Sequence, residues 1–259
     1  MGCAACSSHQ NQIGSEDASP QLAFSAEFEG PAGTLLDDAT WEKELGRNPD
    51  EPSQLEYNTN RAENVSLDGA GFLAITLRKE SYKGSDYTSA RLTTEFRHEL
   101  QYGRFESRMQ LPEGQGLVAQ FFLLGADYPT VDWPACGEVN IFDYTGNTPS
   151  VVTARAHGPG YAPISPLDKA FSLQAGSFSG DYHVFAVDWQ PELLSWSVDG
   201  QEFARVTPQD LPKNGVWVFQ HPFFIVIDLA LGGALAGPPD DTTPYPSELK
   251  VDYVRVYQP

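Results

Sequence analysis

Short β-type runs separated by turn-forming residues dominate the sequence and restrict the fold that it can adopt. Examples are residues 72–78, 117–124 and 223–231, and the middle run is almost wholly apolar, as in a strand buried on both faces. Asp199 and Gly200 stand between two such runs and predict a tight hairpin. Because no long stretch follows the period of a helix, this spacing favours a sandwich of two antiparallel sheets.

The chain length of 259 residues would allow two small domains or one large sandwich. No linker rich in Pro, Gly or Ser divides the middle, so we expect one domain over residues 22–259. The 20 Pro and 23 Gly residues supply frequent turns, and a hydrophobic content of 41% is ample for a core. Residues 1–21 are expected to form a flexible N-terminal tether, since the stretch 7–20 is polar and poorly patterned.

Acidic residues outnumber basic residues by 35 to 16, which gives a formal net charge of −19. Such a surface repels phosphate backbones and anionic membranes, so nucleic-acid binding is not expected. No apolar stretch reaches the length of about 18 residues that a membrane-spanning helix needs. A neutral or cationic partner suits this charge, and high solubility in a saline setting is the alternative explanation.

Two of the three cysteines, Cys3 and Cys6, lie among small residues at the start of the chain. This pattern resembles the processing site of a bacterial lipoprotein whose leader has been trimmed. It predicts a lipid anchor on one of these residues and a location in the cell envelope or outside the cell. A cloning remnant or a misplaced start would give the same pattern. No disulfide framework is implied, and Cys136 is expected to be a small buried filler.

One strand-like run, residues 137–144, carries the candidate chemistry. In it Glu138 and Asp143 flank Asn140, at offsets of two and five from the first acid. Positions two apart share a face of a strand, and one bulge residue would return the fifth position to that face. Two neighbouring carboxyl groups suit cleavage of a glycosidic bond with retention of configuration. An edge strand with a solvated polar face is the alternative.

Eight further segments have an order and spacing that can be compared with known families. They are Lys79–Tyr82, Tyr87–Leu92, Tyr102–Arg108, Leu111–Gly116, Trp133–Glu138, His157–Tyr161, His221–Phe224 and Val251–Tyr257. Together they resemble glycoside hydrolase family 16, in its laminarinase-like branch, over about residues 22–257. The resemblance implies an all-β jelly roll with a substrate cleft on its concave face. It also implies endo-action on β-glucans, typically β-1,3-glucan.

The catalytic strand of that family reads Glu-x-Asp-x-x-Glu, and the resemblance assigns its roles to three residues here. Glu138 stands at the nucleophile, Asn140 at the assisting aspartate and Asp143 at the acid/base. The motif is therefore altered at two positions. Asp143 has a shorter arm than glutamate, and Asn140 cannot repel a neighbouring negative charge. We expect Asn140 to orient Glu138 by hydrogen bonding, and Asp143 to be more acidic than is usual in the family.

The resemblance also implies a set of residues that line the substrate cleft. The expected substrate-binding residues are Trp133, His157, Arg91, Arg108, Tyr57 and Phe122. Val118, Phe122 and Leu235 stand where the family usually has Trp, so less surface is expected for stacking sugar rings. Core packing or surface charge pairing is the alternative role for these residues.

Members of the family often hold a structural Ca²⁺ on the convex side of the fold, and none is needed for catalysis. Glu27 and Asp252 match the side-chain ligands of that ion, which prefers oxygen. Ala26 stands where many members have an aspartate. Two solvated acids on neighbouring strands are the alternative.

These observations lead to three functional hypotheses with a polysaccharide partner, and we expect a monomer. The first is a retaining endo-β-glucanase-like hydrolase of weakened activity, in which Glu138 attacks the anomeric carbon and Asp143 acts as acid and base. The second is a carbohydrate-binding protein on the same scaffold, with its catalysis impaired. The third is a hydrolase or transglycosylase for another polysaccharide, with the cleft rebuilt around Phe121, Phe122 and Leu235.

Overall fold

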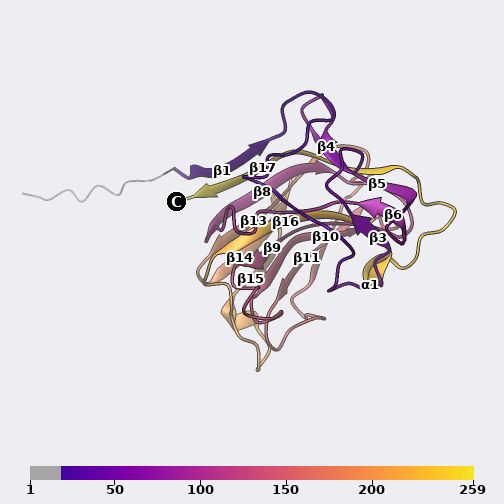
Figure 1. Ribbon diagram of the computed structural model, residues 1–259. Coiled ribbons are helices and arrows are strands. Elements are labelled where there is room, and N and C mark those ends of the chain that lie inside the picture. The colour runs from indigo at the N-terminus through magenta and orange to yellow at the C-terminus, as the bar shows by residue number, and fades with distance from the viewer. Residues whose placement is uncertain (1–18) are drawn as a thin grey trace, which may run out of the picture.

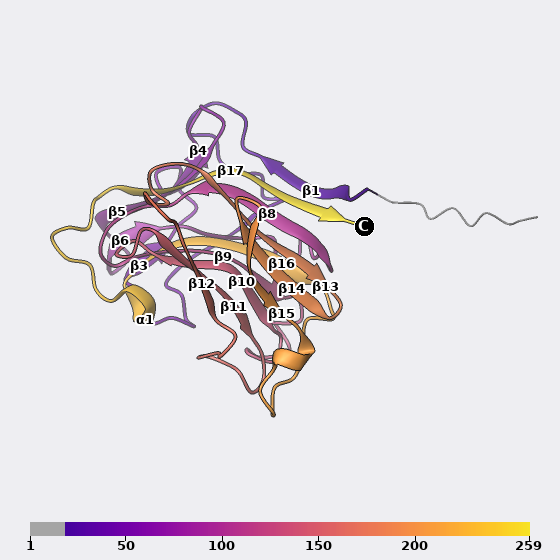
Figure 2. The same ribbon diagram turned by 180° about the vertical axis from the view of Figure 1, so that it is seen from behind.

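The structure is a computed structural model that describes residues 19–259. Its strands form two sheets, whose elements are labelled in Figures 1 and 2. The larger sheet has ten strands: β1 (Gln21–Glu27), β3 (Glu56–Asn58), β4 (Val65–Leu67), β5 (Leu73–Tyr82), β6 (Ser85–Ser89), β8 (Gly103–Gln110), β13 (His183–Gln190), β14 (Leu193–Val198), β15 (Gln201–Val206) and β17 (Ser247–Gln258). The smaller sheet has seven strands: β2 (Glu42–Glu44), β7 (Arg91–Thr93), β9 (Leu117–Gly125), β10 (Glu138–Thr145), β11 (Val151–His157), β12 (Lys169–Ser172) and β16 (Phe223–Leu231).

The strand order brings distant parts of the chain together. The smaller sheet follows the order β12-β11-β10-β9-β16-β7-β2, and the larger one follows β15-β14-β13-β8-β17-β5-β6-β3, with β1 beside β17 and β4 beside β5. The first and last strands therefore lie side by side in both views (Figures 1 and 2). In the described part of the chain the helices are α1 (Gly233–Ala236) and a short 3-10 turn, Pro208–Asp210. The prediction of an all-β protein with two sheets is confirmed, and no described helix has the length and apolar character needed to cross a membrane.

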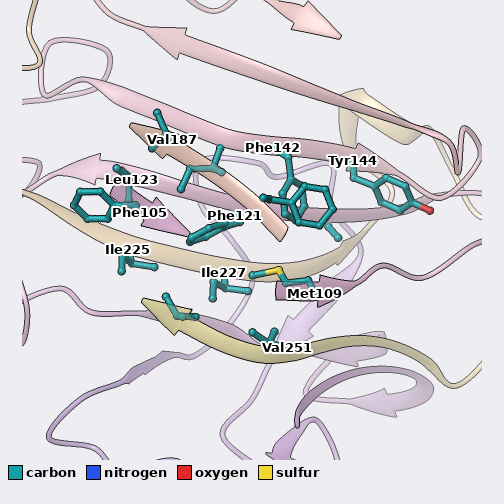
Figure 3. Close-up of a cluster of buried hydrophobic side chains, with 14 of the residues drawn as sticks. Phe105, Met109, Phe121, Leu123, Phe142, Tyr144, Val187, Ile225, Ile227 and Val251 are labelled. Carbon is teal, nitrogen blue, oxygen red and sulfur yellow. The ribbon is translucent and has the colours of Figure 1, made fainter. Parts of the chain in front are cut away.

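The core lies between the two sheets and is built from alternate residues of each strand. Figure 3 shows Phe121, Phe142 and Ile225 of the smaller sheet in one cluster with Met109 and Val251 of the larger sheet. All of them are fully buried. Burying a large apolar side chain stabilises the fold by about 1.5–3 kcal/mol, so this layer is the main source of stability.

The predicted hairpin is present between β14 and β15. Asp199 and Gly200 both have positive φ angles, 51° and 78°, as the tight turns of twisted hairpins require. The Asp199 carboxylate also accepts the backbone N–H of Val184 at 2.8 Å, which ties the turn to β13.

The predicted bulge in β10 is also present. The pairing of β10 shifts register between Asn140 and Asp143 against β11, and between Asn140 and Phe142 against β9. Ile141 and Phe142 consequently both face the core, although they are consecutive. The extra residue turns Asp143 to the same side of the sheet as Asn140, where their side chains are hydrogen-bonded.

Candidate active site

A row of polar side chains crosses the smaller sheet on the face turned away from the core. Its members are cross-strand neighbours, because Arg91 pairs with Asp228, Asp228 with Gln120, and Gln120 with Asp143. Glu44 extends the row at one end as the partner of Arg91. We call this row the polar band, and it consists of Glu44, Arg91, Asp228, Gln120 and Asp143.

Two small apolar clusters cover this face on either side of the polar band. On one side Phe122, Leu124, Cys136, Phe224 and Val226 pack together, with Ala126, Tyr128 and Val131 of the following loop against them. On the other side Val118 and Ala230 pack against Ala236 of α1. The polar band is thus enclosed by apolar groups, which weakens the screening of its charges by water.

Asp143 has polar partners on both of its carboxylate oxygens, with two hydrogen-bond donors on Oδ1 and an ion pair on Oδ2. Its Oδ1 accepts hydrogen bonds from Gln120 Nε2 at 2.7 Å and from Asn140 Nδ2 at 3.0 Å. Its Oδ2 lies 2.7 Å from Nε of Arg155, which comes from β11. Burial raises the pKa of Asp143 above its ordinary value, while Arg155 and the two amides oppose that increase.

Glu138 begins β10 and lies on the same face. Its Oε2 accepts a hydrogen bond of 2.8 Å from the indole N–H of Trp133. Burial and the charge of Asp143 raise the pKa of Glu138 to about 7. The preceding Gly137 has a φ of +77°, and a Cβ there would lie 2.9 Å from the ring of Phe223, so only glycine fits this entry to the strand.

Asn140 differs in part from its expected role. Its amide donates to Asp143, and no hydrogen bond to Glu138 meets the usual geometric limits, although its amide is near enough to lower the pKa of Glu138. Asn140 Oδ1 is buried without a hydrogen-bond partner. Asn140 therefore connects the two acids and orients Asp143 more directly than Glu138.

Trp133 and His157 lie beside Glu138, as the sequence predicted. Their rings are 5.8 Å apart, and His157 is the cross-strand neighbour of Glu138. Burial and the nearby Arg155 lower the pKa of His157 to about 4, so the imidazole is neutral near pH 7. Trp133 is 38% exposed, which leaves part of its indole open for contact with a ligand.

Arg91 lies in the polar band and is held on both sides. It bonds Asp228 at 2.6 Å and Glu44 at 2.8 Å. Its guanidinium carbon also lies 5.2 Å from the ring centre of Phe122. Phe122 is on the expected face but is buried, so it supports Arg91 and does not offer an open stacking surface.

Several other expected cleft residues lie elsewhere. Arg108 projects from β8 of the larger sheet and bonds Asp252 at 2.5 Å, so the expectation that it lines the cleft is not met. Phe121 faces the core, which contradicts its place in a rebuilt cleft. Tyr57 on β3 packs against Tyr82, with 5.4 Å between ring centres, and its place in the cleft stays a prediction.

Leu235 and Cys136 match their expected surroundings more closely. Leu235 lies in α1 beside the polar face and is largely exposed. Cys136 is fully buried, and burial raises the pKa of its thiol to about 12. A neutral thiol is a poor nucleophile, so the prediction of a buried filler is confirmed.

The residues proposed to hold Ca²⁺ do not fit that ion. Glu27 accepts two hydrogen bonds from Arg255, at 2.7 and 2.9 Å, and Asp252 is paired with Arg108. Each carboxylate already has a cationic partner. Within residues 19–259 no group of three or more potential metal-ligating side chains comes together.

Three residues that were not predicted from the sequence complete the site: Gln120, Arg155 and Asp228. Gln120 and Asp228 are the single strongly polar residues in two otherwise apolar strands, and the strands place them opposite each other. An isolated polar residue in a buried strand is costly unless it is paired, so both positions carried a signal. Arg155 had no comparable signal, because arginine is common on a half-exposed strand.

Comparisons with known proteins agree with this arrangement. Residues 53–255 match the family described as Glycosyl hydrolases family 16. The chain is 34% identical to a beta-glucanase of Rhodothermus marinus, over 92% of this chain and 85% of that protein. It is 31% identical to glucan endo-1,3-beta-glucosidase A1 of Niallia circulans, over 93% of this chain but 38% of that longer protein. The crystal structure of the laminarinase catalytic domain from Thermotoga maritima superposes with a TM-score of 0.86 and 36% identity, covering 93% of this chain and 98% of that one. The chain therefore belongs to glycosyl hydrolase family 16 and has its two-sheet jelly-roll fold.

Proposed function

We propose that this protein hydrolyses internal bonds of a β-glucan, with β-1,3-glucan as the first candidate substrate, and retains the configuration at the anomeric carbon. The observation that carries the proposal is the bulge in β10, which puts Glu138 and Asp143 on one face with Asn140 between them. The relatives with glucan-cleaving names support the choice of substrate.

The proposed reaction has two displacement steps. A Glu138 oxygen bonds to the anomeric carbon as the glycosidic oxygen leaves and takes a proton from Asp143. Water then bonds to the anomeric carbon, gives a proton to Asp143 and releases the Glu138 carboxylate. Trp133 holds one oxygen of Glu138 and can also offer its exposed ring to a sugar.

The polar band indicates an uncharged polymer. Glu44, Asp228, Glu138 and Asp143 lie on this face, and Arg91 and Arg155 are each engaged by two carboxylates. A sulfated or uronic-acid chain would meet repulsion there, whereas glucan hydroxyl groups can donate to carboxylates.

A second candidate function is glucan binding with little or no catalysis. It is favoured by the partners of Asp143, which accepts two amide hydrogen bonds and forms an ion pair with Arg155. These partners favour the carboxylate over the carboxylic acid and so oppose proton donation, although burial acts in the other direction. The altered catalytic strand, with Asn140 and Asp143 in place of two acids of the family pattern, supports the same candidate.

Reducing-end release from laminarin, lichenan and agarose tests the first proposal, with Glu138→Gln as the matched control. We expect release from laminarin that the variant lacks, and β-configured first products by NMR. Turnover no higher than that of the variant on every polymer would exclude hydrolysis. Affinity electrophoresis in the same polymers tests binding, and unretarded migration in all of them would exclude the second candidate.

We also propose that the protein acts as a monomer in the cell envelope or outside the cell. A polymeric substrate and the net charge of −19 support this location. Cys3 and Cys6, the expected anchor residues, lie outside the described residues. Partition into detergent in the native host, lost in Cys3→Ser or Cys6→Ser, would support lipidation, and size-exclusion chromatography would test the oligomeric state.

A further inference from the structure

The two carboxyl groups of the proposed active site have different partners. Asp143 accepts hydrogen bonds from two amide N–H groups and forms an ion pair with the Arg155 guanidinium. Glu138 receives the neutral indole N–H of Trp133. Donors stabilise a carboxylate over a carboxylic acid, and a guanidinium does so most strongly because it carries charge.

Arg155 is itself fixed in place. Its NH1 donates to Asp168 at 2.7 Å while its Nε faces Asp143 at the same distance. It reaches Asp143 diagonally across the sheet, since its direct neighbour on β10 is Asn140. The guanidinium therefore lies between the carboxylates of Asp143 and Asp168, and its hydrogen bond to Asp168 sets its orientation.

We propose that Arg155, oriented by Asp168, is a positioning residue that keeps Asp143 ionised, so that the proton shared by the catalytic pair resides on Glu138 in the resting protein. This inference rests on the proposed function for its consequence in catalysis, but its claim about charge can be tested without turnover.

The other groups around Asp143 leave Arg155 as its one cationic contact among the described residues. Four acids are near enough for their charges to interact with that of Asp143: Glu138 on the same strand, Asp228 on β16, Glu51 in the loop before β3, and Asp168 in the segment before β12. Its cross-strand neighbours Gln120 and Thr153 are uncharged. Without Arg155, four acids would surround Asp143 and favour its protonated form.

The pKa values are consistent with this geometry. For Asp143 burial raises the pKa, and Arg155 is the largest opposing influence. For Glu138 burial and the negative charge of Asp143 raise the pKa to about 7, and they outweigh the opposing influences of Asn140, Trp133 and Arg91. The two groups form one coupled pair, and the position of a single proton is set by their relative affinity.

The consequence is that Arg155 slows the proposed reaction. Attack requires ionised Glu138 and protonated Asp143, which is the reverse of the resting arrangement. Only the minor form of the singly protonated pair reacts, so Arg155 lowers the rate without contacting the sugar bond. Replacing Arg155 should therefore increase kcat, which no purely structural role would do.

The direct test measures carboxyl titration by ¹³C NMR in protein labelled at Asp and Glu side chains, with Asp143→Asn and Glu138→Gln to assign the signals. In the natural protein the Asp143 carbon should titrate at lower pH than the Glu138 carbon. In Arg155→Gln the order should reverse. The double variant Arg155→Gln/Asp168→Asn should also show the reversed order, and it avoids an unpaired buried acid if the single variant folds poorly.

Arg108→Gln is the matched control, because Arg108 makes a similar pair with Asp252 on the larger sheet. It should leave both titrations and the pH–rate profile unchanged. In Arg155→Gln the maximum rate of the pH–rate profile should increase, and the profile should move to higher pH. A change of one unit in the pKa difference alters the reactive fraction tenfold, so we expect kcat to rise by about one order of magnitude.

The outcomes separate this inference from the proposed function. If Asp143 holds the proton in the natural protein, or if the order of titration is the same in Arg155→Gln, the inference is overturned. If the titrations behave as expected and no variant releases reducing ends, the charge assignment stands and the proposed hydrolysis fails.

Discussion

The outer faces of the two sheets carry the same kind of ion pair in different surroundings. On the larger sheet Arg255 bonds Glu27 at 2.7 Å, and both side chains are about one-third to two-fifths exposed. In the polar band of the smaller sheet Arg91 bonds Asp228 at 2.6 Å, but the exposures fall to 11% and 4%. The shortest distances are similar, but Arg255 makes two hydrogen bonds to Glu27, whereas Arg91 makes one to Asp228 and one to Glu44. The two pairs therefore differ in hydrogen bonding as well as in access to water.

This difference reverses the effect on the acid. Hydrogen bonding from Arg255 lowers the pKa of Glu27, whereas burial outweighs Arg91 and raises the pKa of Asp228 to about 6. An arginine alone does not determine the state of a neighbouring carboxyl group. Acids whose ionised form is disfavoured by burial are candidates for proton transfer, and Glu138, Asp143 and Asp228 on the smaller sheet are of this kind.

The largest expected effect is on activity, and it distinguishes the outer faces of the two sheets. Glu138→Gln should reduce glucan hydrolysis by at least about 10³-fold, because an amide cannot form the glycosyl–enzyme bond. Glu106→Gln, which changes an acid paired with Arg104 on the larger sheet, should leave kcat/KM unchanged. Rates on laminarin measure both, and a comparable loss in the two variants would remove the functional distinction between the faces.

The second-largest expected effect is on the free energy of unfolding, and it distinguishes the ion pairs of the two sheets. Asp228→Ala should destabilise the fold by about 3–5 kcal/mol, because Arg91 would keep its charge in a buried site with one partner fewer. Asp252→Ala removes the exposed partner of Arg108 and should cost less than about 1 kcal/mol. Urea unfolding followed by fluorescence gives both values, and similar costs would show that burial does not distinguish the pairs.

Asp228 also shows where prediction from sequence stops. The bulge, the sheet architecture and the common face of Glu138 and Asp143 followed from local rules of strand period and turn chemistry. The partners of these acids could not be predicted in this way. Cross-strand register between segments far apart in the chain brings Gln120, Arg155 and Asp228 to the site. The resemblance implied a cleft position for Arg108, but its strand, β8, lies in the larger sheet, and strand alternation alone does not reveal to which sheet a strand belongs.

A smaller effect concerns the pH dependence of stability. Glu56 is buried, accepts the N–H of Leu231 at 2.8 Å, and has its pKa raised to about 7 by burial. The folded state therefore holds its proton more tightly than the unfolded state does, so this contribution to stability is full below the ordinary pKa and is lost as pH rises to about 7. Glu56→Gln keeps a hydrogen-bond acceptor without the charge. At pH 8 this variant should be more stable than the natural protein by on the order of 2 kcal/mol.

Glu27→Gln is the opposite case on the larger sheet. The pKa of Glu27 is lowered, so its contribution is present above the ordinary pKa and is lost as pH falls. The variant should be slightly less stable at pH 8 and equal to the natural protein in strong acid. Unfolding midpoints measured across pH show how the stability difference between each variant and the natural protein changes with pH. A change of the same sign for Glu56→Gln and Glu27→Gln would contradict the role assigned to burial.

The smallest expected effect concerns calcium. Glu27 and Asp252 are each neutralised by an arginine, so a cation would have to displace Arg255 or Arg108 before it could bind. Millimolar CaCl₂ or a chelator should therefore leave Tm unchanged, since a ligand raises Tm only by binding the folded state. A saturable rise in Tm that disappears in Glu27→Gln would show that the ion competes successfully for this carboxylate. The outer face of the larger sheet would then be a ligand-binding face as well, and the contrast with the polar band would reduce to the kind of ligand that each face accepts.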